Sequence, residues 1–242
     1  MNNQLHIGIL AAGKGSRMES PLPKVLHELN GKSLINYVLE TASELNPNSI
    51  TLVVGFQKDR VKNHIKNDNV RYVSQDEQLG TGHAVLQMEN QLINETGHLL
   101  ILYGDVPNIK SITLSPIIDE HIKEDRNATV ITATLDDPTG YGRIIRNQDG
   151  DLLKIVEEKD CTTDEKKIKE WNPGIYIFKI PQLFSELKRI KSNNAANEYY
   201  LTDVIELIKE NSPVQAKKIN DSSEVIGINT ATQLNSLENS EG

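Results

Sequence analysis

Near its amino terminus the chain reads Leu5-His6-Ile7-Gly8-Ile9-Leu10-Ala11-Ala12-Gly13-Lys14-Gly15-Ser16-Arg17-Met18, and Lys24 follows six residues later. An apolar strand pattern ends in a glycine-rich turn, and glycines let backbone N–H groups approach phosphate oxygens without side-chain clashes. Lys14, Arg17 and Lys24 add positive charges near this turn, which suits a polyphosphate. The stretch therefore predicts a buried strand whose carboxyl end binds a nucleotide.

The turn differs from the two commonest nucleotide-binding motifs. The dinucleotide fingerprint would need a third glycine where Met18 stands, and the spacing of a P-loop is absent. A solvated turn with scattered surface charges is the alternative interpretation of the same residues.

The composition is that of an ordinary globular protein. Hydrophobic residues make up 37% of the 242 residues, and the formal net charge is −8 at pH 7. This acidic balance argues against binding nucleic acid or an anionic membrane through bulk charge. The one cysteine, Cys161, excludes an intramolecular disulfide and a thiolate zinc site. Since the chain lacks a membrane-length apolar run and a signal-peptide pattern, we expect a cytoplasmic protein.

Strand and helix patterns alternate through the first half of the chain. We expect strands over residues 5–10, 50–54, 70–73 and 98–103, and helices over 33–45, 58–66 and 80–93. This alternation predicts a three-layer α/β/α, Rossmann-like fold with a mixed, mostly parallel sheet. Ligands bind at the carboxyl ends of such strands, so the loops after residues 10, 73 and 103 should share one edge.

The second half has shorter connections. Strand patterns cover 129–135, 142–146, 152–156 and 174–178, helices are expected over 181–190 and 202–210, and the charged stretch 160–170 indicates an exposed helix or loop. We interpret residues 1–242 as a single domain. Its nucleotide-binding half would cover about 1–110, its sugar-binding half about 111–230, and a frayed tail 235–242.

Polar residues follow two of the expected strands. Asp105 ends the segment Tyr103-Gly104-Asp105, where a carboxylate can hold Mg²⁺ against a phosphate, although capping of the next turn is the alternative role. Gln75 precedes Gly80-Thr81-Gly82, and its amide can complement the edge of a pyrimidine. We interpret His83 as a packing or hydrogen-bonded histidine.

Four further positions in the second half lie at turns or strand ends. Gly142, Glu157 and Asn172 offer a bare backbone, a carboxylate and an amide, a set that suits sugar hydroxyls and an acetamido group. Each alone is an ordinary turn or strand-end residue. Asn229 precedes the last helix, where an asparagine is normally a cap.

Taken in order, these segments resemble the sugar-1-phosphate nucleotidylyltransferases. Within that family the resemblance is to the uridylyltransferase (pyrophosphorylase) domain of the bacterial bifunctional enzymes that make UDP-N-acetylglucosamine. It covers about residues 5–238, and the matching segments are 10–18, 22–27, 77–84, 103–107, 136–144, 155–160 and 198–203.

The resemblance implies UTP and N-acetylglucosamine 1-phosphate as substrates and Mg²⁺ as cofactor. It assigns the nucleotide to Leu10, Ala11, Ala12, Gly13, Lys24, Gln75, Gly80 and Thr81, and the sugar to Tyr103, Gly104, Gly142, Glu157 and Asn172. Arg17, Lys24 and Asp105 would be the catalytic residues, and Asp105 and Asn229 the metal ligands.

The chain departs from the family pattern at two places. Pro173 stands where a threonine is usual, and Ala196-Asn197 replaces Gln-Gly. Moreover, no hexapeptide repeat of a left-handed β-helix occurs before Gly242. We therefore expect neither acetyl transfer nor the trimer of the bifunctional enzymes. A separate acetyltransferase partner is one possible source of acetyl transfer, and the sequence leaves both its existence and the oligomeric state open.

The sequence also allows three alternative functions. The same chemistry could act on another pair, such as dTTP or a sugar phosphate leading to UDP-N-acetylgalactosamine. A non-catalytic nucleotide-sugar-binding subunit is the second, and the complete charged set argues against it. A dinucleotide-binding dehydrogenase is the third, and the missing glycine disfavours it.

Overall fold

A mixed sheet of ten strands runs through residues 4–240, the part of the chain that the computed structural model describes. In spatial order the strands are β5 (Val70–Ser74), β4 (Ser49–Val54), β1 (Leu5–Ala11), β6 (His98–Tyr103), β11 (Tyr176–Lys179), β7 (Ala128–Thr134), β10 (Glu170–Asn172), β8 (Gly142–Arg146) and β9 (Leu152–Val156). The tenth, β12 (Gln215–Lys218), pairs in parallel with β7. Strands β5, β4, β1 and β6 are mutually parallel, so their carboxyl ends share one edge of the sheet, as expected.

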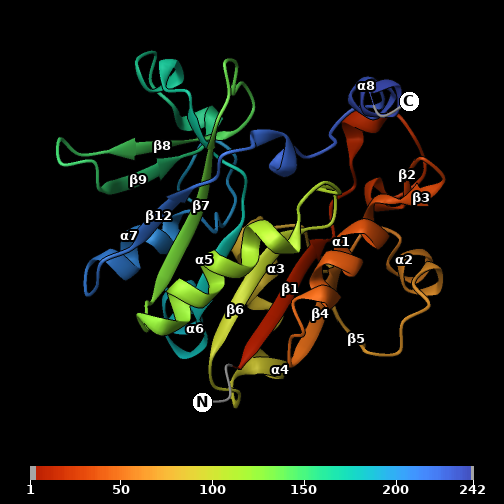
Figure 1. Ribbon diagram of the computed structural model, residues 1–242, viewed down its shortest axis with the longest axis horizontal. Coiled ribbons are helices and arrows are strands. Elements are labelled where there is room, and N and C mark those ends of the chain that lie inside the picture. Colours follow the sequence, from red (N-terminus) through yellow and green to blue (C-terminus); the bar gives the residue numbers. More distant parts are fainter. Residues whose placement is uncertain (1–3, 241–242) are drawn as a thin grey trace.

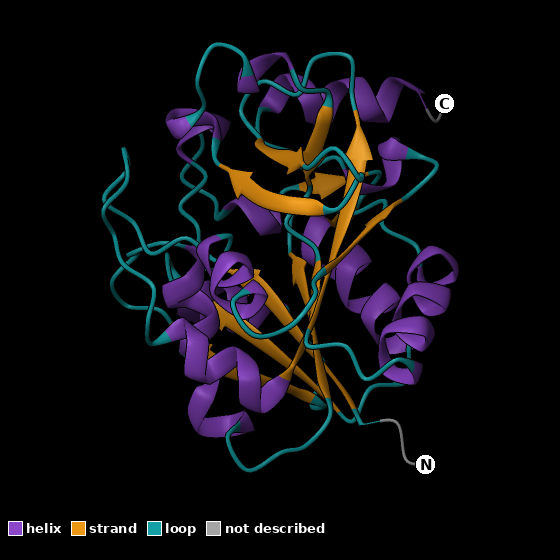
Figure 2. Ribbon diagram, turned by 90° about the vertical axis from the view of Figure 1, so that its left-hand side faces the viewer, coloured by secondary structure: helices purple, strands orange, loops and turns teal. Residues whose placement is uncertain are grey.

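Helices cover both faces of this sheet (Figure 2). One face packs against α1 (Leu34–Glu44), α2 (Lys58–His64) and α5 (Ser111–Lys123). The other packs against α3 (Thr81–Leu86), α4 (Glu89–Leu92), α6 (Ile180–Leu187) and α7 (Asp203–Lys209). The three-layer α/β/α fold expected from the sequence is confirmed.

Strand β1 shows how the sequence builds the two cores. Ile7 and Ile9 are fully buried in the core under α1, whereas Leu10 belongs to the opposite core, because successive side chains of a strand point to opposite faces. Gly8 faces the second core, where a Cβ would lie 2.7 Å from the Met88 side chain. The glycine therefore lets the segment between α3 and α4 pack tightly on the central strand.

A third, smaller apolar cluster lies beside the main sheet. It joins Met18, Leu29, Leu34, Ile228 and Leu234. These residues come from the turn after β1, the hairpin of β2 (Glu28–Leu29) and β3 (Lys32–Ser33), the start of α1, the segment before α8 (Ala231–Ser240), and α8 itself. In Figure 1 the hairpin and α8 lie together, far from β8 and β9. The last helix of the described chain thus packs against residues 18–34.

Several elements differ from those expected. The helix expected over 80–93 is broken at Gln87-Met88, where two successive N–H groups bond three residues back. Helix α5, which contains Pro116, and strand β12 carry no strong periodic pattern and are additional. Glu170, at the end of the charged stretch, begins strand β10: it pairs with Thr134 of β7, and its carboxylate binds Arg146 and Thr132.

The tail prediction also needs correction. Residues 235–240 belong to α8 rather than to a frayed end, because Leu234 packs into the third cluster; residues 241–242 lie outside the described part. Short 3-10 helices complete the structure: η1 (Ser16–Met18), η2 (Lys24–Leu26), η3 (Glu158–Asp160), η4 (Glu165–Lys167) and η5 (Ser222–Val225).

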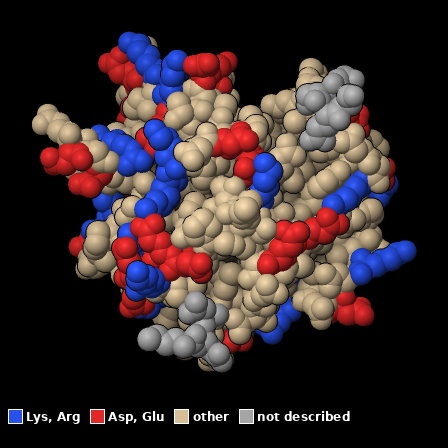
Figure 3. Space-filling view, viewed as in Figure 1, with Lys and Arg blue, Asp and Glu red and all other residues tan. Residues whose placement is uncertain are grey.

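Charged side chains of both signs are interspersed over the face shown in Figure 3, particularly near β7, β8 and β9. None of the helices between residues 4 and 240 combines the length and apolar character needed to cross a membrane.

Candidate active site

Two adjoining cavities open at the carboxyl ends of β1, β5 and β6. The first, of about 480 Å³, lies against the turn after β1. The second, of about 280 Å³, lies toward β8, β9 and β10. Both are lined by Arg17, Lys24, Thr81, Tyr103, Asp105 and Glu198. The two cavities therefore meet at a charged boundary.

The first cavity gathers all the residues expected to contact a nucleotide: Leu10, Ala11, Ala12, Gly13, Lys24, Gln75, Gly80 and Thr81. Gln75 is buried, and its Nε2 donates to the Gly80 carbonyl over 2.9 Å and lies 3.2 Å from the His83 ring. His83 is thus a hydrogen-bonded residue beside the site, as interpreted from the sequence.

The second cavity gathers four of the five residues expected to contact a sugar: Tyr103, Gly142, Glu157 and Asn172. Gly104 is the exception, since it lines neither cavity. Its N–H donates to the Leu10 carbonyl over 3.0 Å, and a Cβ here would lie 3.0 Å from Ile35 and Val25. In this structure the visible role of Gly104 is to let β6 pack against α1.

Two glycines shape the cavity walls through close approach. Gly80 has φ +115°, and a Cβ at this position would lie 2.6 Å from the Tyr199 carbonyl oxygen. Gly174 has φ +84°, and its Cβ would lie 2.5 Å from the Tyr103 ring. A side chain at Gly80 would be strained and would collide with Tyr199, and one at Gly174 would be strained and would collide with Tyr103.

The boundary between the cavities carries a cluster of charged and amide groups. The Lys24 ammonium contacts the Asp105 carboxylate and donates to Asn229 Oδ1 over 2.7 Å. Arg17 Nη2 donates to the same Asn229 oxygen over 2.9 Å. The Asp105 and Asn229 oxygens therefore face one cation position, which the Lys24 ammonium fills. Oxygen donors of this kind fit Mg²⁺.

Backbone contacts bring Asn229 to Asp105 although 124 positions separate them in the sequence. The Ile228 N–H donates to the Asp105 carbonyl over 2.9 Å. At Gly227 a Cβ would lie 3.2 Å from Asp105 Oδ2, so the lack of a side chain leaves that carboxylate accessible. Asn229 is not the helix cap expected of a lone asparagine, because Thr230 and Gln233 cap α8.

The polar groups expected to contact a sugar are held by hydrogen bonds within the protein. Thr202 Oγ1 donates to Glu157 Oε1 over 3.2 Å, and burial raises the pKa of Glu157. Asn172 donates from Nδ2 to the Tyr176 hydroxyl over 2.6 Å and accepts from the Gly174 N–H over 3.1 Å. Burial also raises the pKa of Tyr103, so its hydroxyl stays neutral. The second cavity therefore offers both hydrogen-bond donors and acceptors.

Some lining residues were not among those expected. Glu198 lines both cavities, and Tyr141, Pro173 and Tyr200 line the second. Glu198 and Tyr200 lie in the loop before α7. The expectation that ligands bind at the carboxyl ends of strands therefore does not predict them. Thr202 immediately precedes that helix, but its hydroxyl donates to Glu157 instead of capping the helix.

The two departures from the family pattern, at Pro173 and at Ala196-Asn197, lie in different places relative to the cavities. Pro173 lines the second cavity. Asn197 lines neither cavity and has φ +55°. Glycine adopts this conformation most readily, and asparagine tolerates it better than most residues. Asparagine can therefore replace the usual glycine while keeping the course of the loop.

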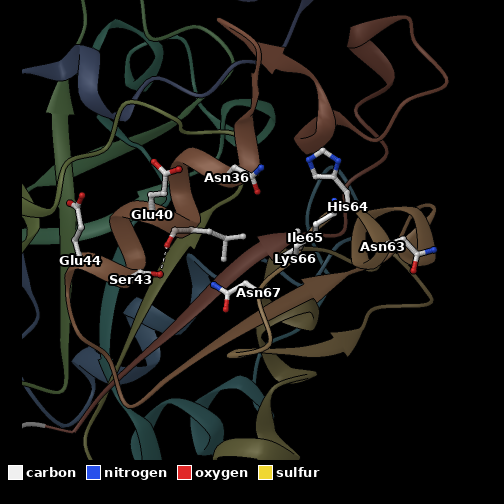
Figure 4. Close-up of a pocket in the computed structure, with 10 residues that line it drawn as sticks. Asn36, Glu40, Ser43, Glu44, Asn63, His64, Ile65, Lys66 and Asn67 are labelled. Atoms are coloured by element: carbon white, nitrogen blue, oxygen red, sulfur yellow. Dashed lines mark hydrogen bonds between the residues drawn. The ribbon is translucent and has the colours of Figure 1, made fainter.

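A larger hollow of about 850 Å³ lies elsewhere, between α1 and the segment after α2 (Figure 4). Its walls include Asn36, Glu40, Ser43, His64 and Asn67. Lys32 neutralises Glu40, and His64 lies 2.9 Å from the Ser33 hydroxyl. None of the expected site residues lines this hollow.

Comparison of the sequence with known proteins identifies a matching family and similar proteins of that kind. The family model of the MobA-like NTP transferase domain matches residues 7–198. The bifunctional protein GlmU of Acetivibrio thermocellus is 46% identical over 93% of this chain and 49% of its own length. GlmU of Streptococcus pyogenes serotype M12 is 44% identical over 95% of this chain and 55% of its own length. The chain thus spans about half the length of these relatives.

Solved structures show the same fold. A UDP-glucose pyrophosphorylase complexed with UDP-glucose superposes with a TM-score of 0.78 at 20% identity, covering 98% of each chain. A putative glucose-1-phosphate thymidylyltransferase from Bacillus anthracis superposes with a TM-score of 0.77 at 18% identity, covering 97% of this chain and 94% of that one. On the family match and the GlmU relatives together, this chain belongs to the MobA-like NTP transferase domain family and is a nucleotidyltransferase.

Proposed function

We propose that the chain transfers UMP from UTP to N-acetylglucosamine 1-phosphate, forming UDP-N-acetylglucosamine and pyrophosphate. The observation that carries the proposal is the cluster of Arg17, Lys24, Asp105 and Asn229 at the boundary of the two cavities. A nucleotide in the first cavity and a sugar phosphate in the second would bring their phosphates together at this cluster. The similarity to GlmU proteins supports the choice of substrates.

The proposed reaction is a direct in-line displacement. A phosphate oxygen of the sugar phosphate forms a bond to the α-phosphorus of UTP. The bond from that phosphorus to the bridging oxygen breaks, and its electron pair leaves with pyrophosphate. No general base is needed, because the second pKa of a phosphate monoester is near 6 and the attacking oxygen is ionised at pH 7. Catalysis then depends on positioning and on neutralising charge.

The side chains of Lys24 and Arg17 are the protein's own source of positive charge for the substrate phosphates. Both line the two cavities, so each can reach phosphates of either substrate. We assign Lys24 to aligning the attacking phosphate with the α-phosphate, and Arg17 to stabilising the leaving pyrophosphate. A fixed cation matters most where charge develops during the reaction.

Asp105 and Asn229 would hold a divalent metal ion, which family members generally use. Bound there, Mg²⁺ would supply charge neutralisation to the phosphates of both substrates. Across residues 4–240 no three His, Cys, Asp or Glu side chains gather to hold a metal by themselves. Two protein oxygens completed by phosphates and water are a usual environment for Mg²⁺.

The test is a substrate panel scored by pyrophosphate release. We expect release with UTP, N-acetylglucosamine 1-phosphate and Mg²⁺ together, and much less when glucose 1-phosphate or dTTP replaces its counterpart. Turnover with a substitute but not with this pair would reassign the substrates while keeping the chemistry. Binding of UDP-N-acetylglucosamine without turnover on any pair would favour a non-catalytic binding subunit.

A further inference from the structure

The amide of Gln233, in the first turn of α8, accepts two hydrogen bonds at once. Its Oε1 receives the Asn229 N–H over 2.7 Å and the Thr230 N–H over 3.1 Å. The Gln233 N–H donates in turn to Thr230 Oγ1 over 3.2 Å. The reciprocal pair between Thr230 and Gln233 is a capping box, which closes the start of a helix. The bond from Asn229 goes beyond what that cap requires.

This extra bond reaches the residue whose side chain faces the cation position. Asn229 Nδ2 donates to the Gly227 carbonyl over 3.1 Å, which turns Oδ1 toward Lys24 and Arg17. Its backbone is fixed on one side by the bond from Ile228 to Asp105 and on the other by the bond to Gln233. Gln233 therefore supplies one of the two backbone anchors beside the Asn229 side chain.

Helix α8 is itself held against the loop that carries Arg17. Leu234 follows Gln233 and packs with Met18, which follows Arg17, and with Ile228. One small cluster thus orients neighbours of both Arg17 and Asn229. Because α8 is fixed in this way, the hydrogen bond to the Gln233 amide can hold Asn229 in a defined position.

We propose that Gln233 is a positioning residue for the metal site: its Oε1 holds Asn229 so that the amide oxygen meets the same cation as Asp105. The inference rests on the proposed function, in which Asn229 and Asp105 share a divalent ion. It assigns to α8 a part in the reaction, although none of the residues of α8 lines either cavity.

The test compares four proteins: the unaltered chain, Gln233→Met, Gln233→Glu and Thr230→Ala. Gln233→Met removes the acceptor at nearly constant length, and Gln233→Glu restores one. Thr230→Ala breaks the cap at the Thr230 hydroxyl but leaves the bond from Asn229 to Gln233. Mn²⁺ binding, followed by electron paramagnetic resonance with UTP present, reports on the site independently of turnover.

We expect Gln233→Met to weaken Mn²⁺ binding about 10-fold or more, the size of effect seen when a partner that orients a metal ligand is lost. Gln233→Glu should restore binding, and Thr230→Ala should stay within about threefold of the unaltered chain. The thermal midpoint should fall similarly in Gln233→Met and Thr230→Ala, because both lose the cap.

Equal weakening in Gln233→Met and Thr230→Ala would overturn the inference, since helix stability would then explain the effect. Unchanged binding in Gln233→Met would overturn it as well. Pyrophosphate release by the unaltered chain distinguishes failure of the proposed function from failure of the positioning role. If release is absent, the proposed function fails. If release is normal and Mn²⁺ binding is unaffected in Gln233→Met, only the positioning role is refuted.

Discussion

The Lys24 ammonium contacts the Asp105 carboxylate and also lies 2.7 Å from Asn229 Oδ1, so a protein cation sits between the two oxygens assigned to Mg²⁺. Side chains of both Lys24 and Asp105 are largely buried, with exposures of 14% and 13%. An ammonium and a metal ion cannot occupy the same position. In the proposed function, metal binding would therefore require Lys24 to move, and the substrate phosphates would provide the negative charge toward which it moves.

Removing this ammonium should affect metal binding and turnover in opposite directions. Lys24→Gln is expected to bind Mn²⁺ several-fold more tightly than the unaltered chain without substrates, because the competing cation is gone. Its turnover should nevertheless fall roughly 10²- to 10³-fold, since a charge that stabilises the transition state is lost. Titration of Mn²⁺ and steady-state pyrophosphate release measure the two effects. Weaker Mn²⁺ binding in the variant would contradict the competition.

Asp105 should be indispensable for metal-dependent turnover. Asp105→Ala is expected to abolish Mg²⁺-dependent pyrophosphate release while leaving the fold intact, because the carboxylate lies at the cavity boundary rather than in a core. Circular dichroism provides the folding control. Near-normal activity of a folded Asp105→Ala protein would rule out the assigned metal ligand.

Arg17 is predicted to act on the leaving group. Arg17→Ala should reduce turnover roughly 10²- to 10³-fold, the usual effect of losing one transition-state donor. Arg17→Lys keeps a positive charge and should recover part of the rate. The measurement is kcat at saturating UTP and Mg²⁺, and a loss below tenfold in Arg17→Ala would argue against this role.

Glu157 should make sugar binding sensitive to acid. Burial raises its pKa, whereas the hydrogen bond from Thr202 lowers it. Only the ionised carboxylate accepts strongly from sugar hydroxyls, so KM for the sugar phosphate should rise as the pH falls through that raised pKa. Thr202→Val should move this rise to higher pH, and Glu157→Gln should remove it. KM profiles between pH 5 and 8 test both, and an unshifted profile in Thr202→Val would contradict the assignment.

A histidine pair far from the site should govern acid stability. His121 Nε2 lies 2.9 Å from His98 Nδ1, its Nδ1 lies 2.8 Å from the Thr129 hydroxyl, and burial lowers the pKa of His121 to about 3. The unfolded chain takes up a proton here near pH 6.5, but the folded chain does not until about pH 3. Stability from this group is therefore complete above pH 6.5 and is lost progressively as the pH falls toward 3.

His121→Gln tests that relationship. The free energy of unfolding of the unaltered chain should fall more steeply with decreasing pH, by about 1.4 kcal/mol per pH unit between pH 6 and 4. Urea titrations of both proteins at several pH values provide the comparison. Parallel pH profiles would show that His121 does not contribute.

Local apolar pattern was sufficient for most strands of the main sheet, but not for β10 and β12. The expected cavity residues came from the glycine-rich and polar segments together with the family resemblance. Apolar runs such as 98–103 are readable as buried strands, and parallel strands necessarily bring Leu10 and Tyr103 to one edge. The Gly13-Lys14-Gly15 turn marks that edge by its composition alone.

The rest depends on long-range contacts that residue types do not encode. Lys24 meets Asn229 across 205 positions, and only the fold and the resemblance bring them together. Asn172 and Gly104 are both buried, yet Asn172 lines a cavity whereas Gly104 packs against Ile35. Helix α5 was missed because Pro116 interrupts its pattern, although packing against α1 stabilises it.

The most direct test of UMP transfer follows labelled phosphorus. The protein is supplied with N-acetylglucosamine 1-phosphate, Mg²⁺ and UTP labelled at either the α- or the β-phosphorus. We predict that the α-label appears in UDP-N-acetylglucosamine and the β-label in pyrophosphate, because the bond between them is the one that breaks. A β-label in the sugar nucleotide, or an α-label that remains in UTP while the protein is folded and metal-bound, would contradict the account.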